Sequence, residues 1–205
     1  MPAPKTQTLQ RQEQIVQAAL ELINDSGVTG LSIAGIAQKV GIVPSALYRH
    51  FTSKDAVLDA VLDLIQQRLM ANVAHVRKQT PAPLQQLKQL FTRHTALLNE
   101  NQAIPHVVFS DAVYTGLPDR RARVAQIITT YLKEVETIIA SGRQDGTIRK
   151  DVVPATAAIM FLGMIMPAAV LWNVSGGKFD MVTHARTAWP AYERSIAAQL
   201  SKEAS

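Results

Sequence analysis

Residues 31–54 read LSIAGIAQKVGIVPSALYRHFTSK, a pattern typical of two short helices joined by a tight turn. Ser32 occupies a helix-start position, apolar residues follow it at helical spacing, and Gly41 stands where that helix is expected to end. Pro44 opens the second helix, because the first helical position requires no backbone N–H donor and suits the fixed φ of proline. We expect this second helix to end near Phe51.

The two short helices need a third one, because two helices of about two turns each cannot bury a core by themselves. The segment 11–24 supplies it, since its apolar residues fall on one stripe and Gly27 follows at the C-cap position. That stripe consists of Ile15, Ala18, Ala19, Leu22 and Ile23. The pattern therefore predicts a three-helix unit of the helix-turn-helix type that enters DNA grooves.

The second short helix carries the side chains that are candidates to contact bases. On a helical wheel of about 100° per residue, three residues point toward the core: Val43, Leu47 and Phe51. Three others point away from it: Ser45, Tyr48 and Arg49. Arg49 is the strongest candidate for base discrimination, because a guanidinium can donate two hydrogen bonds to a guanine edge. The alternative is a solvated helix surface that happens to hold a Tyr and an Arg.

Two further residues are candidates for phosphate contact. His50 lies toward the buried side of the wheel, so it either braces the helix or reaches a phosphate. Lys54 follows Thr52 and Ser53, either of which can cap the next helix, and its ammonium would lie beside exposed N–H groups that attract phosphate. The full set of DNA-contact candidates is Ser32, Pro44, Ser45, Tyr48, Arg49, His50 and Lys54.

The same stretch resembles a known family. The runs at 36–41, 46–51 (Ala-Leu-Tyr-Arg-His-Phe) and 53–55 (Ser-Lys-Asp) are similar to the N-terminal domain of the TetR family of bacterial transcriptional regulators. The resemblance covers about the first sixty residues, whereas the remainder is similar only in length and helical character. Val43 stands where members usually carry Ser, and Ser45 where they often carry Gly, so an operator preference is not transferable.

The resemblance implies a homodimer that binds a double-stranded DNA operator, and a C-terminal domain that encloses a small molecule. The two recognition helices would enter successive major grooves, about 34–36 Å apart. A bound effector that favours a different spacing would release the DNA.

Composition and charge fit a cytoplasmic protein that works as a pair. Of 205 residues 47% are hydrophobic and none is Cys, which excludes a disulfide scaffold and thiolate metal sites. The N-terminus has no apolar signal-peptide region. Residues 1–54 contain five basic and three acidic residues, a net charge of only +2, so one copy would bind phosphates weakly. The arm around Lys5 is either an added DNA contact or a disordered tail.

The rest of the chain is predicted to be helical, because no segment alternates as a strand does. A long amphipathic helix follows Lys54 and runs to a Pro-containing loop at 80–83. Further helices are expected at 84–99, 105–114, 118–141, 157–172 and near the C-terminus. The predicted fold class is all-α with about nine helices. The predicted domains are 1–54 for DNA binding and 55–205 for ligand binding and dimerisation.

Segment 157–172 is apolar almost throughout, but sixteen residues with an internal Pro are short for a bilayer span and lack a basic flank. We therefore expect a helix buried between partners and no membrane association. In the final helix, apolar residues at spacings of three and four fit a dimer seam or an intramolecular core equally well. The family resemblance favours dimerisation through the last two helices. The interface candidates are Val182, Ala185, Trp189, Tyr192 and Ile196.

An effector pocket would accept a hydrophobic or amphipathic molecule, since aromatic and Met side chains supply adaptable apolar area. The candidate wall residues are Phe109, Tyr114, Tyr131, Met160, Phe161, Met164 and Trp172. Ordinary core packing is the alternative for each of them. The basic trio Arg120, Arg121 and Arg123 fits a solvated surface by default, or recognition of an acidic ligand group.

Other functions are compatible with parts of the sequence. An enzyme is disfavoured, because the five His residues form no metal-binding pair and neither a Gly-rich phosphate loop nor a Gly-x-Ser-x-Gly elbow is present. A DNA-binding protein without small-molecule control, or a helical ligand-binding protein, remains open. No catalytic residue, metal or cofactor is expected.

Overall fold

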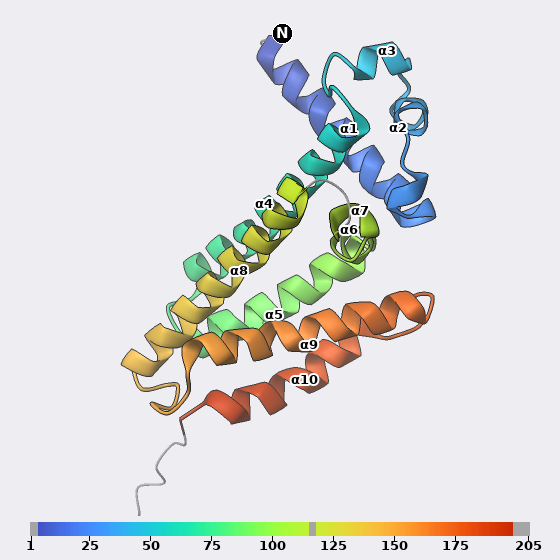
Figure 1. Ribbon diagram of the computed structural model, residues 1–205. Coiled ribbons are helices and arrows are strands. Elements are labelled where there is room, and N and C mark those ends of the chain that lie inside the picture. Colours follow the sequence, from blue (N-terminus) through green and yellow to red (C-terminus); the bar gives the residue numbers. More distant parts are fainter. Residues whose placement is uncertain (1–3, 115–117, 199–205) are drawn as a thin grey trace, which may run out of the picture. The chain divides into compact units, whose positions relative to one another are not determined.

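The computed structural model describes residues 4–114 and 118–198, and Figure 1 shows them as a ribbon. Within these residues the chain forms ten α-helices and one 3-10 helix, with no strand and one isolated bridge between Ile148 and Ala197. The all-α fold class is confirmed; two of the helices, α3 and α7, have only four residues each. The elements are α1 (Pro4–Ser26), η1 (Val28–Gly30), α2 (Ile33–Val40), α3 (Pro44–Leu47), α4 (Lys54–Gln79), α5 (Pro83–Glu100), α6 (Ala103–Val108), α7 (Asp111–Tyr114), α8 (Pro118–Gln144), α9 (Pro154–Val174) and α10 (Met181–Ile196).

The chain divides into two compact units. Unit 1 comprises residues 1–68 and 101–126, and unit 2 comprises residues 69–100 and 127–205. The chain passes between the units three times: within α4, just after α5 and within α8. Unit 1 thus contains the helix-turn-helix together with α6, α7 and the start of α8. The functional division into 1–54 and 55–205 stays a prediction.

The caps predicted for α2 are both present. The Ser32 hydroxyl accepts a hydrogen bond from the backbone N–H of Gly35 at 3.1 Å, and Gly41 closes the helix with φ 75° and ψ 35°. After Gly41, the N–H of Ile42 returns to the carbonyl of Ala37 at 2.9 Å, which satisfies a carbonyl at the helix end. Since residues with a side chain rarely adopt this left-handed conformation, the glycine fixes where the turn occurs.

Helix α1 is longer than the helix predicted at 11–24. It begins at Pro4, so the segment expected to be an arm around Lys5 is the first turn of a helix. Its apolar stripe is buried as predicted, with Ile15 and Ile23 fully inaccessible, and it packs against α2, η1 and α6 within unit 1. Helix α1, which completes the three-helix DNA-binding motif, therefore also supports α6.

The single helix predicted at 105–114 is two helices, α6 and α7. The chain breaks at Phe109 and Ser110, where the Ser110 hydroxyl donates to the carbonyl of Val107 at 2.9 Å. The Ser110 carbonyl then accepts the N–H of Val113 at 3.0 Å, which starts the second helix. A Ser that bonds to nearby backbone competes with the helical ladder, a signal that the sequence pattern did not weigh.

Unit 2 is built from α5, α9 and α10, which pack against one another, together with parts of α4 and α8. The chain end is held by the bridge at Ile148, where the N–H of Arg149 donates to the carbonyl of Ile196 at 2.9 Å. By length and composition α9 could cross a membrane, but only 33% of its most apolar stretch is buried, and an apolar core helix passes the same test. The expected contact of α9 with the final helix is confirmed.

Candidate functional site

The second helix of the helix-turn-helix is short and is extended by helical turns. Helix α3 ends at Leu47, and residues to Phe51 continue with hydrogen bonds such as His50 N–H to the Leu47 carbonyl at 2.9 Å. Pro44 occupies the first turn, as predicted. Leu47 is fully buried and anchors this recognition element to the core of unit 1.

The recognition element presents a group of exposed side chains to solvent. Ser32, Pro44, Ser45, Arg49 and Lys54 are exposed, and Tyr48 is 54% exposed. Val43, predicted to face the core, is 63% exposed, because it precedes the helix in extended backbone and does not follow the helical wheel. This correction adds an apolar side chain beside Ser45. Contact of these residues with DNA stays a prediction.

His50 lies against the first turns of α1. Its side chain is half-buried, and its Nδ1 atom is buried without a hydrogen-bond partner among the described residues. Together with residues of α1 it lines a groove of 620 Å³; the other lining residues are Gln7, Thr8, Gln10, Arg11 and Gln14. This position fits the bracing role predicted for His50 better than the phosphate contact that was the alternative.

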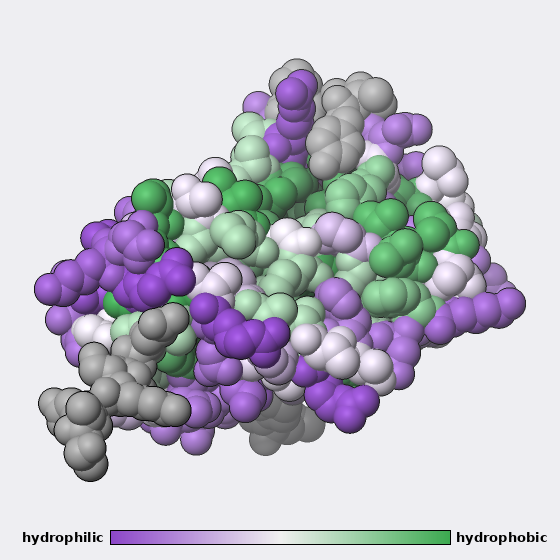
Figure 2. Space-filling view, turned by 90° about the horizontal axis from the view of Figure 1, so that it is seen from below, coloured by the Kyte–Doolittle hydropathy of each residue, from purple (hydrophilic) through white to green (hydrophobic). Residues whose placement is uncertain are grey.

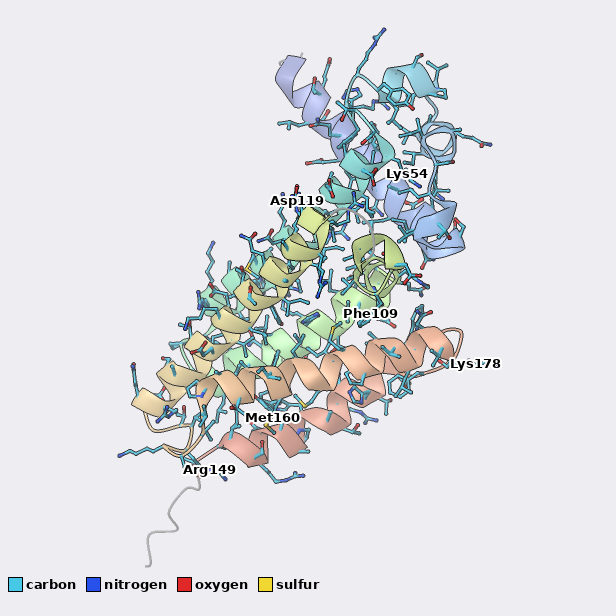
Figure 3. All side chains as sticks on the ribbon, in the orientation of Figure 1. Lys54, Phe109, Asp119, Arg149, Met160 and Lys178 are labelled. Atoms are coloured by element: carbon cyan, nitrogen blue, oxygen red, sulfur yellow. The ribbon has the colours of Figure 1, made fainter. Side chains whose placement is uncertain are left out.

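Lys54 begins helix α4, immediately after the recognition element (Figure 3). The Ser53 hydroxyl accepts a hydrogen bond from the N–H of Ala56 at 3.1 Å. Ser53 is therefore the residue that caps α4, whereas the sequence alone allowed either Thr52 or Ser53. Lys39, by contrast, pairs with Glu21 at 3.1 Å and Asp25 at 3.9 Å. Lys54 is thus an exposed cation at a helix start, where N–H groups also attract anions.

The basic trio at the start of α8 is not the solvated surface that we expected. The Arg120 side chain is only 3% exposed and pairs with Asp55 and Asp59 of α4, each at 2.9 Å. Arg123 pairs with Asp63, and only Arg121 is exposed. Burial alone lowers the pKa of Arg120, but the hydrogen bonds that Arg120 donates to Asp59 and Asp55, and the charges of these two groups, outweigh burial and raise that pKa. The signal missed in the sequence is an aspartate every fourth residue of α4 opposite two arginines.

The predicted effector-wall residues do not form one lining. Tyr131 and Phe161 are buried within unit 2, Met164 and Trp172 are half-buried there, and Met160 is 50% exposed (Figure 3). Phe109 belongs to unit 1 and is 45% exposed. The side chain of Tyr114 lies outside the described residues. The predicted pocket stays a prediction.

Tyr131 forms a buried polar pair with His94. The Tyr131 hydroxyl and His94 Nδ1 share a hydrogen bond of 2.9 Å, and the two rings meet edge to face at 5.0 Å. Burial lowers the pKa of His94 to about 4 and raises the pKa of Tyr131, so both are neutral at pH 7. Among the described residues, no group of three or more His, Cys, Asp or Glu side chains could hold a metal ion.

The predicted dimer seam of α10 is instead part of the core of unit 2. Trp189 contacts Phe91 at a ring distance of 6.2 Å, and the Tyr192 hydroxyl donates to the carbonyl of Ala157 at 2.8 Å. The buried candidates are Ala185, Trp189, Tyr192 and Ile196, whereas Val182 is 66% exposed. The four buried side chains pack within one copy, which favours the intramolecular alternative for them, and their place in a dimer interface stays a prediction.

Helix α9 leaves an apolar stripe uncovered. Its exposed apolar side chains form two groups, at 159–160 and 170–174, and the exposed Gly163 and Pro167 continue the same face between them at spacings of three and four. These exposed apolar residues are Ile159, Met160, Val170, Leu171 and Val174. Figure 2 shows hydrophobic residues gathered on the side of the molecule seen from below. Exposed apolar side chains grouped on one helix are typical of a face that meets a partner.

Two family profiles match the chain. Residues 15–61 match the family described as bacterial regulatory proteins, tetR family, and residues 62–193 match the YsiA-like protein, C-terminal region. Among curated relatives, the nucleoid occlusion factor SlmA of Marinobacter nauticus is 26% identical over 156 residues, covering 76% of this chain and 78% of the relative. The fatty acid metabolism regulator protein of Bacillus subtilis is 22% identical over 169 residues, covering 82% and 87%.

Solved structures share the fold. A transcriptional regulator FadR from Bacillus subtilis in complex with stearoyl-CoA superposes with a TM-score of 0.75 at 20% identity, covering 90% of this chain and 98% of that chain. At this identity the likeness concerns the arrangement of helices.

Proposed function

The chain belongs to the TetR family of DNA-binding transcriptional regulators, and from this membership we propose that it is a homodimeric repressor released from a palindromic operator by a hydrophobic or amphipathic effector. The observation that carries the proposal is the recognition element. Buried Leu47 anchors it, while Ser45, Tyr48 and Arg49 are exposed on its other side. A helix with this polarity suits a major groove.

The proposed division of labour on DNA follows from chemistry and exposure. Arg49 discriminates bases, since a guanidinium matches the acceptors of guanine, and Tyr48 packs on a thymine methyl or donates to a phosphate. Lys54 anchors a phosphate at the start of α4. Because the first 54 residues carry a net charge of only +2, two copies are needed to neutralise enough phosphates.

The exposed apolar stripe of α9 supports dimerisation. A single copy would leave Val170, Leu171 and Val174 in water, and pairing of two copies would bury them. This assignment replaces the seam on α10 while retaining the last two helices as the region of dimer contact. Pairing through α9 would also explain why this helix is apolar without crossing a membrane. We propose a cytoplasmic location.

The effector class is proposed from the relatives. One curated relative is named a fatty acid metabolism regulator, and one similar structure holds stearoyl-CoA. The profile matched by residues 62–193 covers most of unit 2, whose core is aliphatic and aromatic. We therefore propose a long-chain acyl compound as the effector of this chain.

A second candidate is a DNA-binding factor that acts in nucleoid occlusion without a small effector. The relative in Marinobacter nauticus carries that name at 26% identity. DNA binding that no acyl compound changes would favour this second function.

The experiment that tests the repressor proposal selects bound fragments from genomic DNA and measures their affinity with Arg49→Ala. We expect a palindromic site and an affinity loss of about tenfold or more, since one bidentate base contact is worth about 1–3 kcal/mol. Arg121→Ala, which removes another exposed guanidinium from outside the recognition element, is the matched control and should bind as the parent does. Equal binding to all sequences, unchanged by Arg49→Ala, would overturn the proposal.

A further inference from the structure

Helix α8 contributes a buried cation to unit 1. The side chain of Arg120 is 3% exposed, and its guanidinium joins two aspartates one turn apart on α4, with Nη2 on Asp55 and Nε on Asp59 at 2.9 Å each. Nη2 also lies 3.4 Å from the backbone carbonyl of Asp55. A guanidinium is planar and holds its donors in a fixed fork, so these contacts restrict both the position and the rotation of the first turns of α4.

Neighbouring pairs continue the same contact along α4. Arg123 of α8 pairs with Asp63, one turn beyond Asp59. Further along, Arg68 donates to Asn101, just before α6, and to Gln17 of α1 at 3.2 Å. We call the set Asp55, Asp59, Asp63, Arg120 and Arg123 the charge seam. All its members lie in unit 1.

The charge seam begins where the DNA-binding surface ends. Asp55 directly follows Lys54, and the two belong to the first turn of α4, which Ser53 caps. The direction of α4 determines where the exposed ammonium of Lys54 and the free N–H groups of that turn point. A residue that fixes this turn therefore fixes where the phosphate anchor lies relative to the recognition element.

We propose that Arg120 is a positioning residue for operator binding. By pairing with Asp55 and Asp59 it orients the start of α4, and with it Lys54. Arg120 itself does not contact DNA. The proposal rests on the DNA-binding function proposed above. It extends the functional DNA-binding unit to a residue that lies 66 positions after Lys54 in the chain.

A residue that acts through Lys54 and a residue that acts independently of it differ when both side chains are removed together. Loss of a phosphate contact lowers the slope of log affinity against log salt by about 1 for each copy, since one fewer counterion is released. If Arg120 acts by placing Lys54, its loss lowers that same slope, and it has little further effect once Lys54 is already absent. A purely structural ion pair would change neither affinity nor slope while the protein stays folded.

The test compares full-length variants on the selected operator over a range of salt. We expect Arg120→Gln to lose about tenfold or more in affinity and to lower the slope, because Asp55 and Asp59 then repel each other across one turn and Lys54 is displaced. Arg120→Lys should recover part of the affinity, since an ammonium reaches one of the two carboxylates. Arg121→Gln, an exposed neighbour with the same charge change, should bind as the parent. Lys54→Gln should lower both affinity and slope, and the double variant of Arg120→Gln and Lys54→Gln should lose little more than Lys54→Gln alone.

Hydrogen exchange of the amides at 54–59 provides a second measurement, and Arg120→Gln should accelerate it. If Arg120→Gln fails to fold, Asp59→Asn replaces it, because it leaves the pair of Arg120 with Asp55 in place, and we expect a smaller loss of affinity. Folded variants that bind as tightly as the parent, or a double variant with Lys54→Gln whose losses add in full, would overturn the positioning role. Failure of the parent itself to select a DNA site would instead overturn the proposed function.

Discussion

Gly41 illustrates how a single residue determines the geometry of the DNA-binding motif. Its φ of 75° lies in the left-handed region, and a Cβ built on it would meet no atom within 4 Å. Glycine is therefore required at position 41 because of the backbone conformation, and not because a side chain would lack space. Gly146, with φ 79° in the loop after α8, has the same backbone and equally open surroundings.

We expect Gly41→Ala and Gly146→Ala each to lower the free energy of unfolding by about 1–2 kcal/mol, the cost of a left-handed L-residue. Only Gly41→Ala should also weaken operator binding, because only that turn sets the angle between α2 and the recognition element. Denaturant unfolding and DNA titration of the two variants check this. Equal effects of both variants on DNA affinity would contradict it.

His94 makes stability depend on pH. Its folded pKa is about 4 against an ordinary value of 6.5, because burial disfavours the charged form. Between these two values the unfolded chain binds a proton that the folded chain refuses, so stability is full above pH 6.5 and falls as the pH drops toward 4. The shift corresponds to about 3 kcal/mol.

The measurement is the free energy of unfolding between pH 7 and 4 for the parent and for His94→Gln, whose amide can still bond to the Tyr131 hydroxyl. We expect the variant to lose about 3 kcal/mol less than the parent over this range. His75→Gln changes an exposed histidine of α4 and is the control. Parallel pH profiles for all three proteins would show that His94 is not the group responsible.

At the scale of elements, the sequence predicted best where local chemistry marks both ends of a helix. Ser32 and Gly41 define α2 to the residue, and the prolines at 81 and 83 separate α4 from α5. The prediction failed where the partner of a surface had to be known. Spacings of three and four in α10 identify an apolar face, but they do not say whether α5 or a second copy covers it.

The candidate site likewise contains some residues whose exposure the sequence predicted and others for which it did not. Exposure of Ser45, Tyr48 and Arg49 followed from the helical wheel around Leu47. Val43 did not, because it lies in extended backbone before the helix, where the wheel does not apply. The burial of Arg120 requires the starts of α4 and α8 to meet, with paired residues 61 and 65 positions apart in sequence, and the pattern of neither helix alone encodes this meeting.

For α9 we expect Leu171→Glu to convert dimers into monomers, because a carboxylate at the centre of an apolar contact loses water without gaining a partner. Light scattering after gel filtration measures the mass, and operator affinity should fall at least about tenfold as the second recognition element is lost. Leu9→Glu, which charges an exposed leucine of α1, should leave the mass unchanged. A dimeric Leu171→Glu would place the interface elsewhere.

At the scale of the whole molecule, effector binding couples to stability. A ligand at about 100 times its dissociation constant adds about 2.7 kcal/mol to a folded protein. For a chain of 205 residues this corresponds to a rise in Tm of about 5–10 °C.

We therefore expect long-chain acyl-CoA, but neither CoA alone nor a short-chain acyl-CoA, to raise Tm and to release the operator in the same concentration range. Thermal unfolding and DNA titration with this series measure both effects. Stabilisation without release would separate ligand binding from DNA control, and absence of both would favour the factor without a small effector.

The three passages of the chain between its units have an evolutionary consequence. A single recombination point near residue 68 would join the recognition element, with Asp55, Asp59 and Asp63, to a foreign α8 that need not carry Arg120 and Arg123. Such a chimaera would inherit three acidic groups without their cations. Transfer of the DNA specificity of this chain to another protein therefore requires the segment 101–126 to travel with the N-terminal part, so the chain is less modular as a gene than the linear order of its domains suggests.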